Sequence, residues 1–251
     1  MGWVWLVLLG LGATSSGCGD DDAECSGASF TGGPVTCGMA GAFDRTVCVE
    51  GKLRVFRQYV PATVACDVPP PLIVFLHGNG GDESSGDVAR AVADELGAVY
   101  VTPRGYSQGD YLGFGPEGIP NSRTFLTMVV DQVRMEFPAE FALLTGFSAG
   151  AFFSSYCIAW LNDRLAGVGI FGAGIAENFV GDLSRAPVKM PVSIRIGDQD
   201  SLRNYADSLV AQLTAAGWPP ERIDSKRFQG GHMWSPEMMR DAFHFAKMSS
   251  Q

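Results

Sequence analysis

The stretch Phe141-Ala-Leu-Leu-Thr-Gly-Phe-Ser-Ala-Gly150, with the apolar run that continues to Trp160, decides the fold. Residues 141–146 have the uninterrupted apolar character of a short strand buried on both faces. Residues 146–150 form a G-x-S-x-G turn, and residues 151–163 carry apolar side chains at helical spacing. A sharp turn with a central serine between a strand and a helix is typical of a nucleophile elbow.

We expect close packing to require both glycines of this turn. A side chain at Gly146 or Gly150 would collide with the neighbouring strand or helix, and the serine itself would adopt a strained backbone conformation. The serine also lies at a helix N-terminus, where free N–H groups favour developing negative charge. The alternative interpretation is an ordinary Gly/Ser turn, and the flanking strand and helix favour the elbow.

Strands and helices alternate through the rest of the chain. We expect strands at residues 52–60, 72–76, 98–102, 167–171, 192–196 and 222–228. We expect helices at residues 82–97, 122–137 with Ser122 as N-cap, 202–216 and 236–248, and a long loop over 105–121. This alternation predicts an α/β fold, with a mostly parallel sheet and helices on both faces. Active sites of such sheets lie at the carboxyl ends of the strands.

Composition narrows the class of protein. A chain of 251 residues with 46% hydrophobic residues is long and apolar enough for one large domain. The net charge is −9, and the absence of any basic cluster argues against nucleic acid as a partner. The histidines lack metal-ligand spacing, no C-x-x-C occurs, and no dinucleotide fingerprint opens the sheet, so we expect neither a metal nor a cofactor.

The first residues predict export. Residues 3–12 form an apolar run too short to span a bilayer comfortably, as in a signal peptide, which we place at residues 1–17. Ser15-Ser-Gly-Cys18, followed by an acidic stretch, resembles a bacterial lipoprotein signal and implies a lipid anchor on Cys18 as the contact with a membrane. Ser15 stands where leucine is usual, and no Lys or Arg precedes the run. Ordinary secretion and an uncleaved anchor therefore stay open as alternatives.

Cysteine usage agrees with export. Four cysteines (Cys25, Cys37, Cys48 and Cys66) precede the first central strand, and an oxidising compartment favours disulfides among them. They allow three pairings, of which we favour Cys25–Cys37 with Cys48–Cys66. We expect residues 18–50 to be a tether and a small irregular segment, residues 51–251 to be the catalytic domain, and Cys157 to be a buried free thiol.

Four motifs give the chain a family resemblance from about residue 50 onward. They are Leu76-His-Gly78, the turn at 146–150, Gly197-Asp-Gln-Asp200 and Gly231-His-Met-Trp234. Their order resembles that of the α/β-hydrolase superfamily. Within it, the chain resembles the exported serine esterases grouped with polyhydroxybutyrate depolymerases, feruloyl esterases and acetyl xylan esterases. The interval between Phe171 and Val192 is too short for a large helical lid, so we expect an open site.

The resemblance implies a Ser-Asp-His triad of Ser148, Asp200 and His232. Ser148 would attack an ester carbonyl, and His232 would act as the base. The acid would be Asp200 rather than Asp198, because in the resembling esterases it lies three residues after the glycine that ends this strand. The N–H groups of Ala149 and Asn79 would form the oxyanion hole.

We expect aromatic side chains to contact the substrate. The candidates are Trp234 and three residues of the long loop, Tyr106, Tyr111 and Phe114. His77 would order the turn after its strand, and His244 would be structural. The predicted function is an exported serine hydrolase of carboxylic esters, whether short-chain, aryl or polymer-linked (feruloyl, acetyl-xylan or hydroxyalkanoate). The alternatives are a catalytically silent binding module and a serine peptidase or lipase of the same fold.

Overall fold

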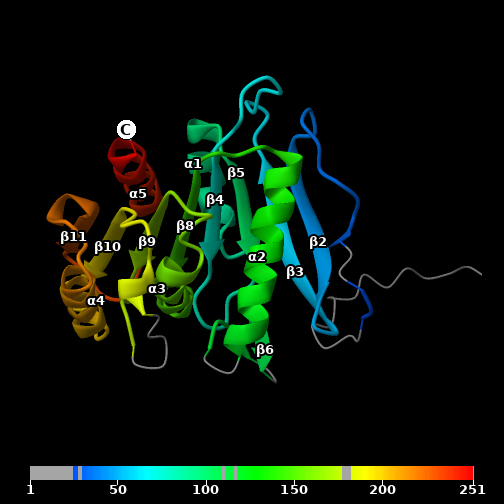
Figure 1. Ribbon diagram of the computed structural model, residues 1–251. Coiled ribbons are helices and arrows are strands. Elements are labelled where there is room, and N and C mark those ends of the chain that lie inside the picture. Colours follow the sequence, from blue (N-terminus) through cyan, green and yellow to red (C-terminus); the bar gives the residue numbers. More distant parts are fainter. Residues whose placement is uncertain (1–24, 28–29, 109–110, 116–117, 177–181, 251) are drawn as a thin grey trace, which may run out of the picture.

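A nine-stranded sheet organises the part of the chain that the computed structural model describes, namely residues 25–27, 30–108, 111–115, 118–176 and 182–250. Its strands are β1 (Phe30–Thr31), β2 (Gly41–Val49), β3 (Lys52–Val60), β4 (Leu72–Leu76), β5 (Val99–Pro103), β8 (Ala142–Phe147), β9 (Gly167–Phe171), β10 (Val192–Gly197) and β11 (Ile223–Phe228). They lie side by side in the order β1-β2-β3-β5-β4-β8-β9-β10-β11, from the β2 edge to the β11 edge in Figure 1.

Six neighbouring strands, from β5 to β11, run parallel, whereas β1, β2 and β3 add an antiparallel edge. The connections contain α1 (Arg90–Leu96), α2 (Ile119–Glu136), α3 (Ala149–Trp160), α4 (Arg203–Ala215) and α5 (Pro236–Ser249). They also contain single turns η1 (Asp87–Ala89), η4 (Leu183–Arg185) and η5 (Pro220–Arg222), and a hairpin of β6 (Tyr106–Gln108) and β7 (Tyr111–Gly113). The predicted α/β class, with a mostly parallel sheet, is confirmed.

Helices cover both faces of this sheet, and β4 shows why its sequence is continuously apolar. Its alternate residues Leu72, Val74 and Leu76 pack in the core beneath α2, α3 and α4. Ile73 and Phe75 point the other way, into the core beneath α1 and α5. Each of these five side chains is at most 1% exposed, as expected for a strand buried on both faces.

The first helix is shorter than predicted. We expected a helix over residues 82–97, in which Val88 and Val92 recur at helical spacing. Residues 82–86 instead form turns, η1 makes one tight turn, and α1 begins only at Arg90. Val88 is 66% exposed, and the small residues Ala89 and Ala93 face the core in its place. Val92 of α1 is also buried, so the later start of the helix removes Val88 but not Val92 from the expected buried face.

The region before α2 also differs from its prediction. Part of the expected loop over 105–121 forms the β6–β7 hairpin, and α2 begins at Ile119 rather than at Ser122. Pro120 lies in the first turn of the helix, where its missing N–H costs no hydrogen bond. Ser122 therefore lies inside the helix, buried, and is not the N-cap.

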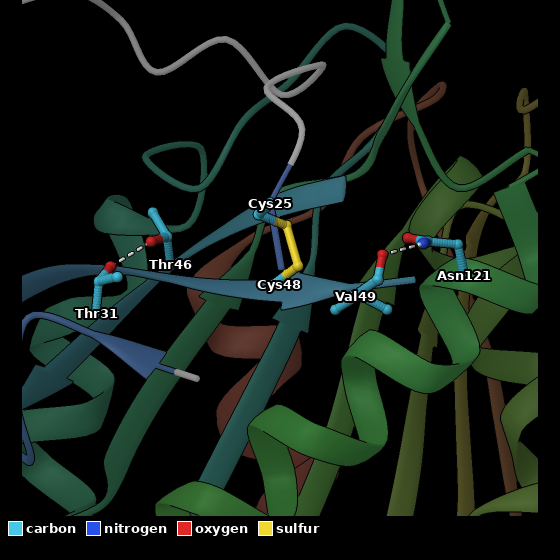
Figure 2. The surroundings of a disulfide bond; sticks show 6 residues. All are labelled: Cys25, Thr31, Thr46, Cys48, Val49 and Asn121. Carbon is cyan, nitrogen blue, oxygen red and sulfur yellow. Dashed lines mark hydrogen bonds between the residues drawn. A yellow bond between two sulfur atoms is a disulfide. The ribbon is translucent and has the colours of Figure 1, made fainter. Parts of the chain in front are cut away.

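The N-terminal region contributes to the sheet. We expected residues 18–50 to be a tether and an irregular segment, but Gly41–Val49 form β2, which pairs with β3 along its whole length. Asn121 of α2 donates a side-chain hydrogen bond of 3.0 Å to the Val49 carbonyl, which ties this edge to the helix (Figure 2). The predicted signal peptide and Cys18 lie outside the described residues. Within the described ranges, no helix is long and apolar enough to cross a membrane.

Two disulfides join Cys25 to Cys48, shown in Figure 2, and Cys37 to Cys66, so the pairing that we favoured is wrong. The β2–β3 hairpin gives the physical reason. Antiparallel register places Gly41 opposite Val60, which brings the segment before β2 close to the segment after β3. Near the hairpin turn, the Cys25 N–H donates to the Gly51 carbonyl, which holds Cys25 beside Cys48. Cys157, which lies far from these four cysteines in the sequence, is buried and free, as predicted.

The Cys37–Cys66 disulfide should stabilise the fold measurably. It closes a loop with a sequence separation of 29 residues, for which the chain-entropy argument gives about 3.6 kcal/mol. We expect the double variant Cys37→Ser, Cys66→Ser to lose roughly that much unfolding free energy in urea titrations. Mapping of non-reduced peptides in the wild type supplies the control. Recovery of a Cys25–Cys37 peptide, or an unchanged midpoint in the variant, would contradict this assignment.

Candidate active site

Four loops at the carboxyl edge of the parallel strands bring the candidate residues together. Ser148 follows β8, and the turn containing Asn79 follows β4. Asp200 follows β10, and His232 follows β11. The parallel alignment of these strands is what gathers residues that are far apart in the sequence.

Ser148 has the strained conformation of an elbow. Its backbone has φ 54° and ψ −117°, a left-handed region that residues other than glycine rarely enter. A Cβ at Gly146 would lie 2.4 Å from the Gly150 carbonyl oxygen, and a Cβ at Gly150 would lie 2.2 Å from the Leu76 carbonyl oxygen. The predicted requirement for both glycines is confirmed, because backbone atoms occupy the space that any side chain would need.

Ser148, His232 and Asp200 form a continuous hydrogen-bonded chain. The His232 Nε2 lies 2.9 Å from the Ser148 Oγ, and the His232 Nδ1 lies 2.8 Å from the Asp200 Oδ2. An ionised carboxylate can only accept, so the Nδ1–H donates to Asp200. Nε2 is then left as the acceptor for the Ser148 hydroxyl, which is the arrangement that general-base catalysis requires.

The two aspartates after β10 have different environments. The Asp200 side chain is fully buried, and its Oδ1 accepts a 2.8 Å hydrogen bond from the Leu202 N–H. This second bond fixes the carboxylate while Oδ2 faces His232. Asp198 is exposed, and its Oδ1 accepts a 3.0 Å hydrogen bond from the Gly230 N–H. Asp198 therefore braces the loop that carries His232, and does not contact the imidazole.

Two residues that the sequence analysis missed position the His232 ring. The ring of Phe147 packs against it, with centroids 4.8 Å apart. Gly172 has φ +64°, and a Cβ there would come within 2.8 Å of the Phe147 ring and 3.3 Å of the His232 Cε1. Phe147 is the first variable position of the G-x-S-x-G turn. Its sequence position was visible, but the contact that gives it a role depends on a residue 85 positions later.

The predicted oxyanion donors come from the start of α3 and from the turn after β4. Ala149 is the first residue of α3, so its N–H has no acceptor one turn earlier in the helix. The neighbouring Gly150 N–H donates to the His77 carbonyl at 3.1 Å, which joins the elbow to the turn after β4. A Cβ at Gly78 would lie 3.2 Å from the Ser148 Cβ, so this turn passes directly beside the serine. Asn79 is the next residue of the turn.

His77 ties this turn to the loop after β5. Its ring is buried, and its Nδ1–H donates to the Gly78 carbonyl at 2.7 Å. Its Nε2 accepts the Gly105 N–H at 2.8 Å. Both nitrogens are therefore used by a neutral imidazole, and burial lowers the pKa of His77.

This buried histidine should make stability depend on pH. Because the folded pKa of His77 lies below its unfolded value, the stabilisation is complete above about pH 6.5 and is lost as the pH falls below that value. The slope from one such group is at most about 1.4 kcal/mol per pH unit. We expect the stability of His77→Asn, measured by urea unfolding between pH 5 and 8, to fall less steeply with acidification than that of the wild type. Parallel curves for the two proteins would contradict the neutral assignment.

A pocket of about 220 Å³ opens beside the serine. It is lined by Phe75, His77, Gly78, Asn79, Gly81, Ser85, Phe147 and Trp234. Of the predicted substrate-contacting residues, Trp234 lines this pocket, and the side chain of Tyr111 lies outside the described residues. The structure does not place the other two here. Tyr106 packs beneath the Lys52 ammonium, 4.9 Å from its ring centroid, and Phe114 is buried against the rings of His77 and Phe153.

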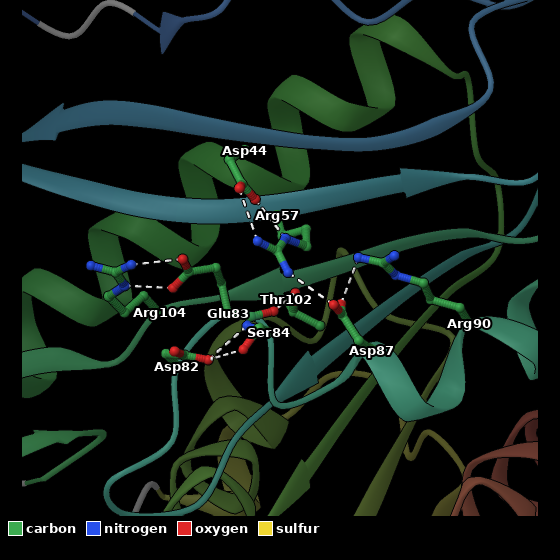
Figure 3. Close-up of polar contacts among 9 residues, drawn as sticks. All are labelled: Asp44, Arg57, Asp82, Glu83, Ser84, Asp87, Arg90, Thr102 and Arg104. Carbon is green, nitrogen blue, oxygen red and sulfur yellow. Dashed lines mark hydrogen bonds and ion pairs between the residues drawn. The ribbon is translucent and has the colours of Figure 1, made fainter. Parts of the chain in front are cut away.

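Ion pairs hold the loop that forms one side of the pocket (Figure 3). Glu83 forms a two-pronged pair with Arg104, at 2.5 and 2.6 Å, and Thr102 donates to the Glu83 carbonyl. Asp87 pairs with Arg57 of β3 at 2.9 Å and with Arg90 at 2.8 Å. The segment between Glu83 and Asp87 is thus fixed at both ends to the sheet. Among the described side chains, no group of three or more His, Cys, Asp or Glu residues is arranged to hold a metal ion.

Comparison with solved structures identifies the fold. The chain is similar to an S-formylglutathione hydrolase from Staphylococcus aureus, with a TM-score of 0.62 and 14% identity over 89% of this chain and 99% of that one. It is also similar to an esterase from Pyrobaculum calidifontis (TM-score 0.66, 16% identity, 87% of each chain). A ferulic acid esterase gives a TM-score of 0.61 and 15% identity over 81% of this chain and 94% of the other. Comparisons with protein-family models and with curated proteins gave no match. The chain has the α/β-hydrolase fold.

Proposed function

We propose that this protein is a serine hydrolase that cleaves carboxylic esters through an acyl-enzyme. The observation that carries the proposal is the chain of hydrogen bonds from Ser148 through His232 to the buried Asp200, built on a strained elbow. Neither the strain nor the burial of a carboxylate is needed to stabilise an ordinary turn. Several solved structures of this fold are of proteins named as esterases, which supports carboxylic esters as the substrate class.

The geometry supports a two-step reaction. The Ser148 Oγ attacks the ester carbonyl carbon as its proton passes to the His232 Nε2, while Asp200 stabilises the imidazolium. The N–H groups of Ala149 and Asn79 would bind the carbonyl oxygen as it becomes an oxyanion. His232 then protonates the alcohol oxygen, the C–O bond breaks, and the acyl group stays on Ser148. A water molecule deprotonated by His232 releases the acid and restores the serine.

The size of the pocket favours small or aryl esters over long-chain lipids as substrates. Its volume of about 220 Å³ lies below the range of about 300–1,000 Å³ that is usual for drug-sized ligands. The described part of the connection between β9 and β10 holds only the single turn η4, so no large helical lid is present there. We therefore expect short-chain, aryl or polymer-linked esters, among them feruloyl, acetyl-xylan and hydroxyalkanoate esters, without interfacial activation.

Labelling with a fluorophosphonate probe tests the proposed function. The probe should attach to Ser148 of the intact protein, and the labelled protein should lose hydrolysis of p-nitrophenyl acetate. A folded protein that neither reacts nor hydrolyses any ester would favour the alternative of a silent binding module. Cleavage of peptides in preference to esters, or a rise in rate only above the solubility limit of a long-chain ester, would favour a peptidase or a lipase.

We also propose that the protein is exported, with a lipid on Cys18. The two disulfides favour an oxidising compartment, and the residues before Cys18 resemble a lipoprotein signal. With its own leader in a bacterium, the wild type should partition into detergent, whereas Cys18→Ser should not. Equal partitioning of the two proteins would leave ordinary secretion or an uncleaved leader.

A further inference from the structure

The two disulfides differ in how well solvent reaches their sulfur atoms. In the Cys25–Cys48 bond, Cys48 is only 7% exposed and Cys25 is half-buried. In the Cys37–Cys66 bond, Cys37 is half-buried but Cys66 is exposed. Thiol–disulfide exchange requires a thiolate to reach one of the two sulfurs, so exposure makes a disulfide reactive. Cys66 is therefore the cysteine that a thiol from solution reaches first.

A cavity of about 200 Å³ lies beside this exposed disulfide. Cys37 and Cys66 line the cavity together with Ala65, Asp67, Val68, Pro69, Pro70, Glu136, Phe137 and Pro138. At about 30 Å³ for each water-sized group, the cavity has room for roughly six heavy atoms. Most of its wall is apolar, so the carbon chain of a short thiol attached to Cys66 would leave water there.

The charges around this cavity favour a cationic ligand. Glu136 is buried, and its Oε2 accepts a 2.8 Å hydrogen bond from the Arg45 Nη1, so an ion pair neutralises its charge. Asp67 is exposed and follows Cys66 directly in the chain. A thiol that approaches Cys66 therefore meets the negative charge of Asp67, which attracts a cationic thiol and repels an anionic one.

We propose that Cys66 is a site of reversible S-thiolation by a small cationic thiol, such as an aminothiol. The thiolate of the ligand attacks the Cys66 Sγ and forms a mixed disulfide with it. The Cys37–Cys66 bond breaks, and its electron pair leaves on the Cys37 sulfur, which takes a proton from water. One disulfide is exchanged for another, so the step needs no further oxidant or reductant. Attack by Cys37 on the mixed disulfide reverses it.

This site lies at the opposite end of the sheet from the candidate active site, and its use does not depend on the proposed esterase activity. Pro70 precedes β4 and Pro138 precedes β8, whereas Asn79 and Ser148 follow these two strands. Thiolation opens the loop that the disulfide closes, so the urea midpoint of the thiolated protein should fall toward that of the double serine variant. An unchanged midpoint in thiolated protein would overturn the proposed exchange.

The first test maps exchange in the folded protein. The wild type is incubated with 2-aminoethanethiol, quenched in acid, alkylated with N-ethylmaleimide under denaturing conditions and digested for mass spectrometry. We expect the adduct on Cys66 at least about tenfold more often than on Cys37, with the Cys25–Cys48 peptide intact. Equal adduct on Cys66 and Cys37, or exchange of both disulfides at the same rate, would overturn the proposal.

The second test measures the contribution of the Asp67 charge. Asp67→Asn should lower the ratio of exchange rates for 2-aminoethanethiol over 3-mercaptopropionate by about threefold at low salt, because attraction and repulsion are both removed. Asp207→Asn, at an exposed position of α4, is the matched control and should leave the ratio unchanged. The same ratio in the wild type and in Asp67→Asn would overturn the preference for a cationic thiol.

The third test distinguishes the cavity from simple exposure of the sulfur. Ala65→Phe places a large side chain at the cavity, whereas Ala62→Phe makes the same change at an exposed residue that does not line it. In a fixed mixture of 2-aminoethanethiol and its disulfide, the equilibrium constant for the Cys66 adduct should fall about fivefold in Ala65→Phe and stay unchanged in Ala62→Phe. Equal constants in the two variants would overturn the role of the cavity.

Discussion

Replacing Ser148 with alanine should lower kcat for ester hydrolysis by about 10⁶-fold, the scale reported for the loss of a nucleophilic serine. The substitution removes the oxygen that would attack the carbonyl carbon, and neither His232 nor Asp200 can take its place. The Ser148 Oγ contacts His232, whereas the elbow is held by backbone contacts such as the bond from the Ser148 N–H to the Phe171 carbonyl. Alanine keeps that backbone bond, so we expect the variant to fold.

The measurement is a pre-steady-state and steady-state assay with p-nitrophenyl acetate, accompanied by urea unfolding of the same preparations. Ser225→Ala, at an exposed position of β11, provides a matched serine control and should keep wild-type activity. An alanine variant at position 148 that retains more than about a hundredth of the wild-type kcat would refute the role of Ser148 as nucleophile.

The central strands could be predicted because burial on both faces leaves a strong signal in the sequence. The bounds of β3, β4 and β9 agree with the predicted ranges 52–60, 72–76 and 167–171. The start of α1 could not be predicted, because Val88 and the buried Val92 fit the same helical periodicity although residues 82–86 form turns. Ala89, Val92 and Ala93 are buried, whereas Val88 is exposed.

The disulfides and the pocket depend on contacts that cross the whole fold. Cysteine spacing alone could not reveal that the β2–β3 register brings Cys37 to Cys66, because we had not predicted β2 at all. For the pocket, we predicted Trp234, which lines it, and three aromatic residues of one long loop. The residues that line it come from three separate strand ends, and Phe75 appeared in the sequence only as part of a buried strand.

The residues of the G-x-S-x-G turn, unlike the disulfides and the pocket, could be predicted from the sequence. The G-x-S-x-G turn needs its glycines because a Cβ at Gly146 would lie 2.4 Å from the Gly150 carbonyl oxygen of α3, and a Cβ at Gly150 would lie 2.2 Å from the Leu76 carbonyl oxygen of β4. Both restrictions fall on glycines within one five-residue motif, which is therefore visible in the sequence even though one of the contacts reaches a distant strand. The histidine partner of the serine was implied by the family resemblance, and the structure places His232 against Ser148.

Replacing Asp200 with asparagine should lower kcat by about 10⁴-fold, although the side chain keeps its size. The Asp200 carboxylate accepts from the His232 Nδ1–H at 2.8 Å and from the Leu202 N–H at 2.8 Å. An amide retains one acceptor oxygen. With the Leu202 N–H holding that oxygen, the amide NH₂ would face Nδ1 and force the imidazole into the opposite tautomer, with its proton on Nε2. That nitrogen could then no longer accept the proton of Ser148, and the charge that stabilises the imidazolium would also be gone.

The matched variant is Asp198→Asn, in which the same chemical change is made two residues earlier. Asparagine at position 198 can still accept the Gly230 N–H through its amide oxygen, and Asp198 does not contact His232, so we expect a loss of less than about tenfold in kcat. The pH–rate profiles of both variants show whether His232 still acts as a base. Their urea unfolding shows whether the loop that carries His232 has been destabilised. A larger kcat loss in Asp198→Asn than in Asp200→Asn would show that the acid has been misassigned. The Ser148–His232 contact would then need a different carboxylate, and the 2.8 Å bond between His232 and Asp200 would be a structural one.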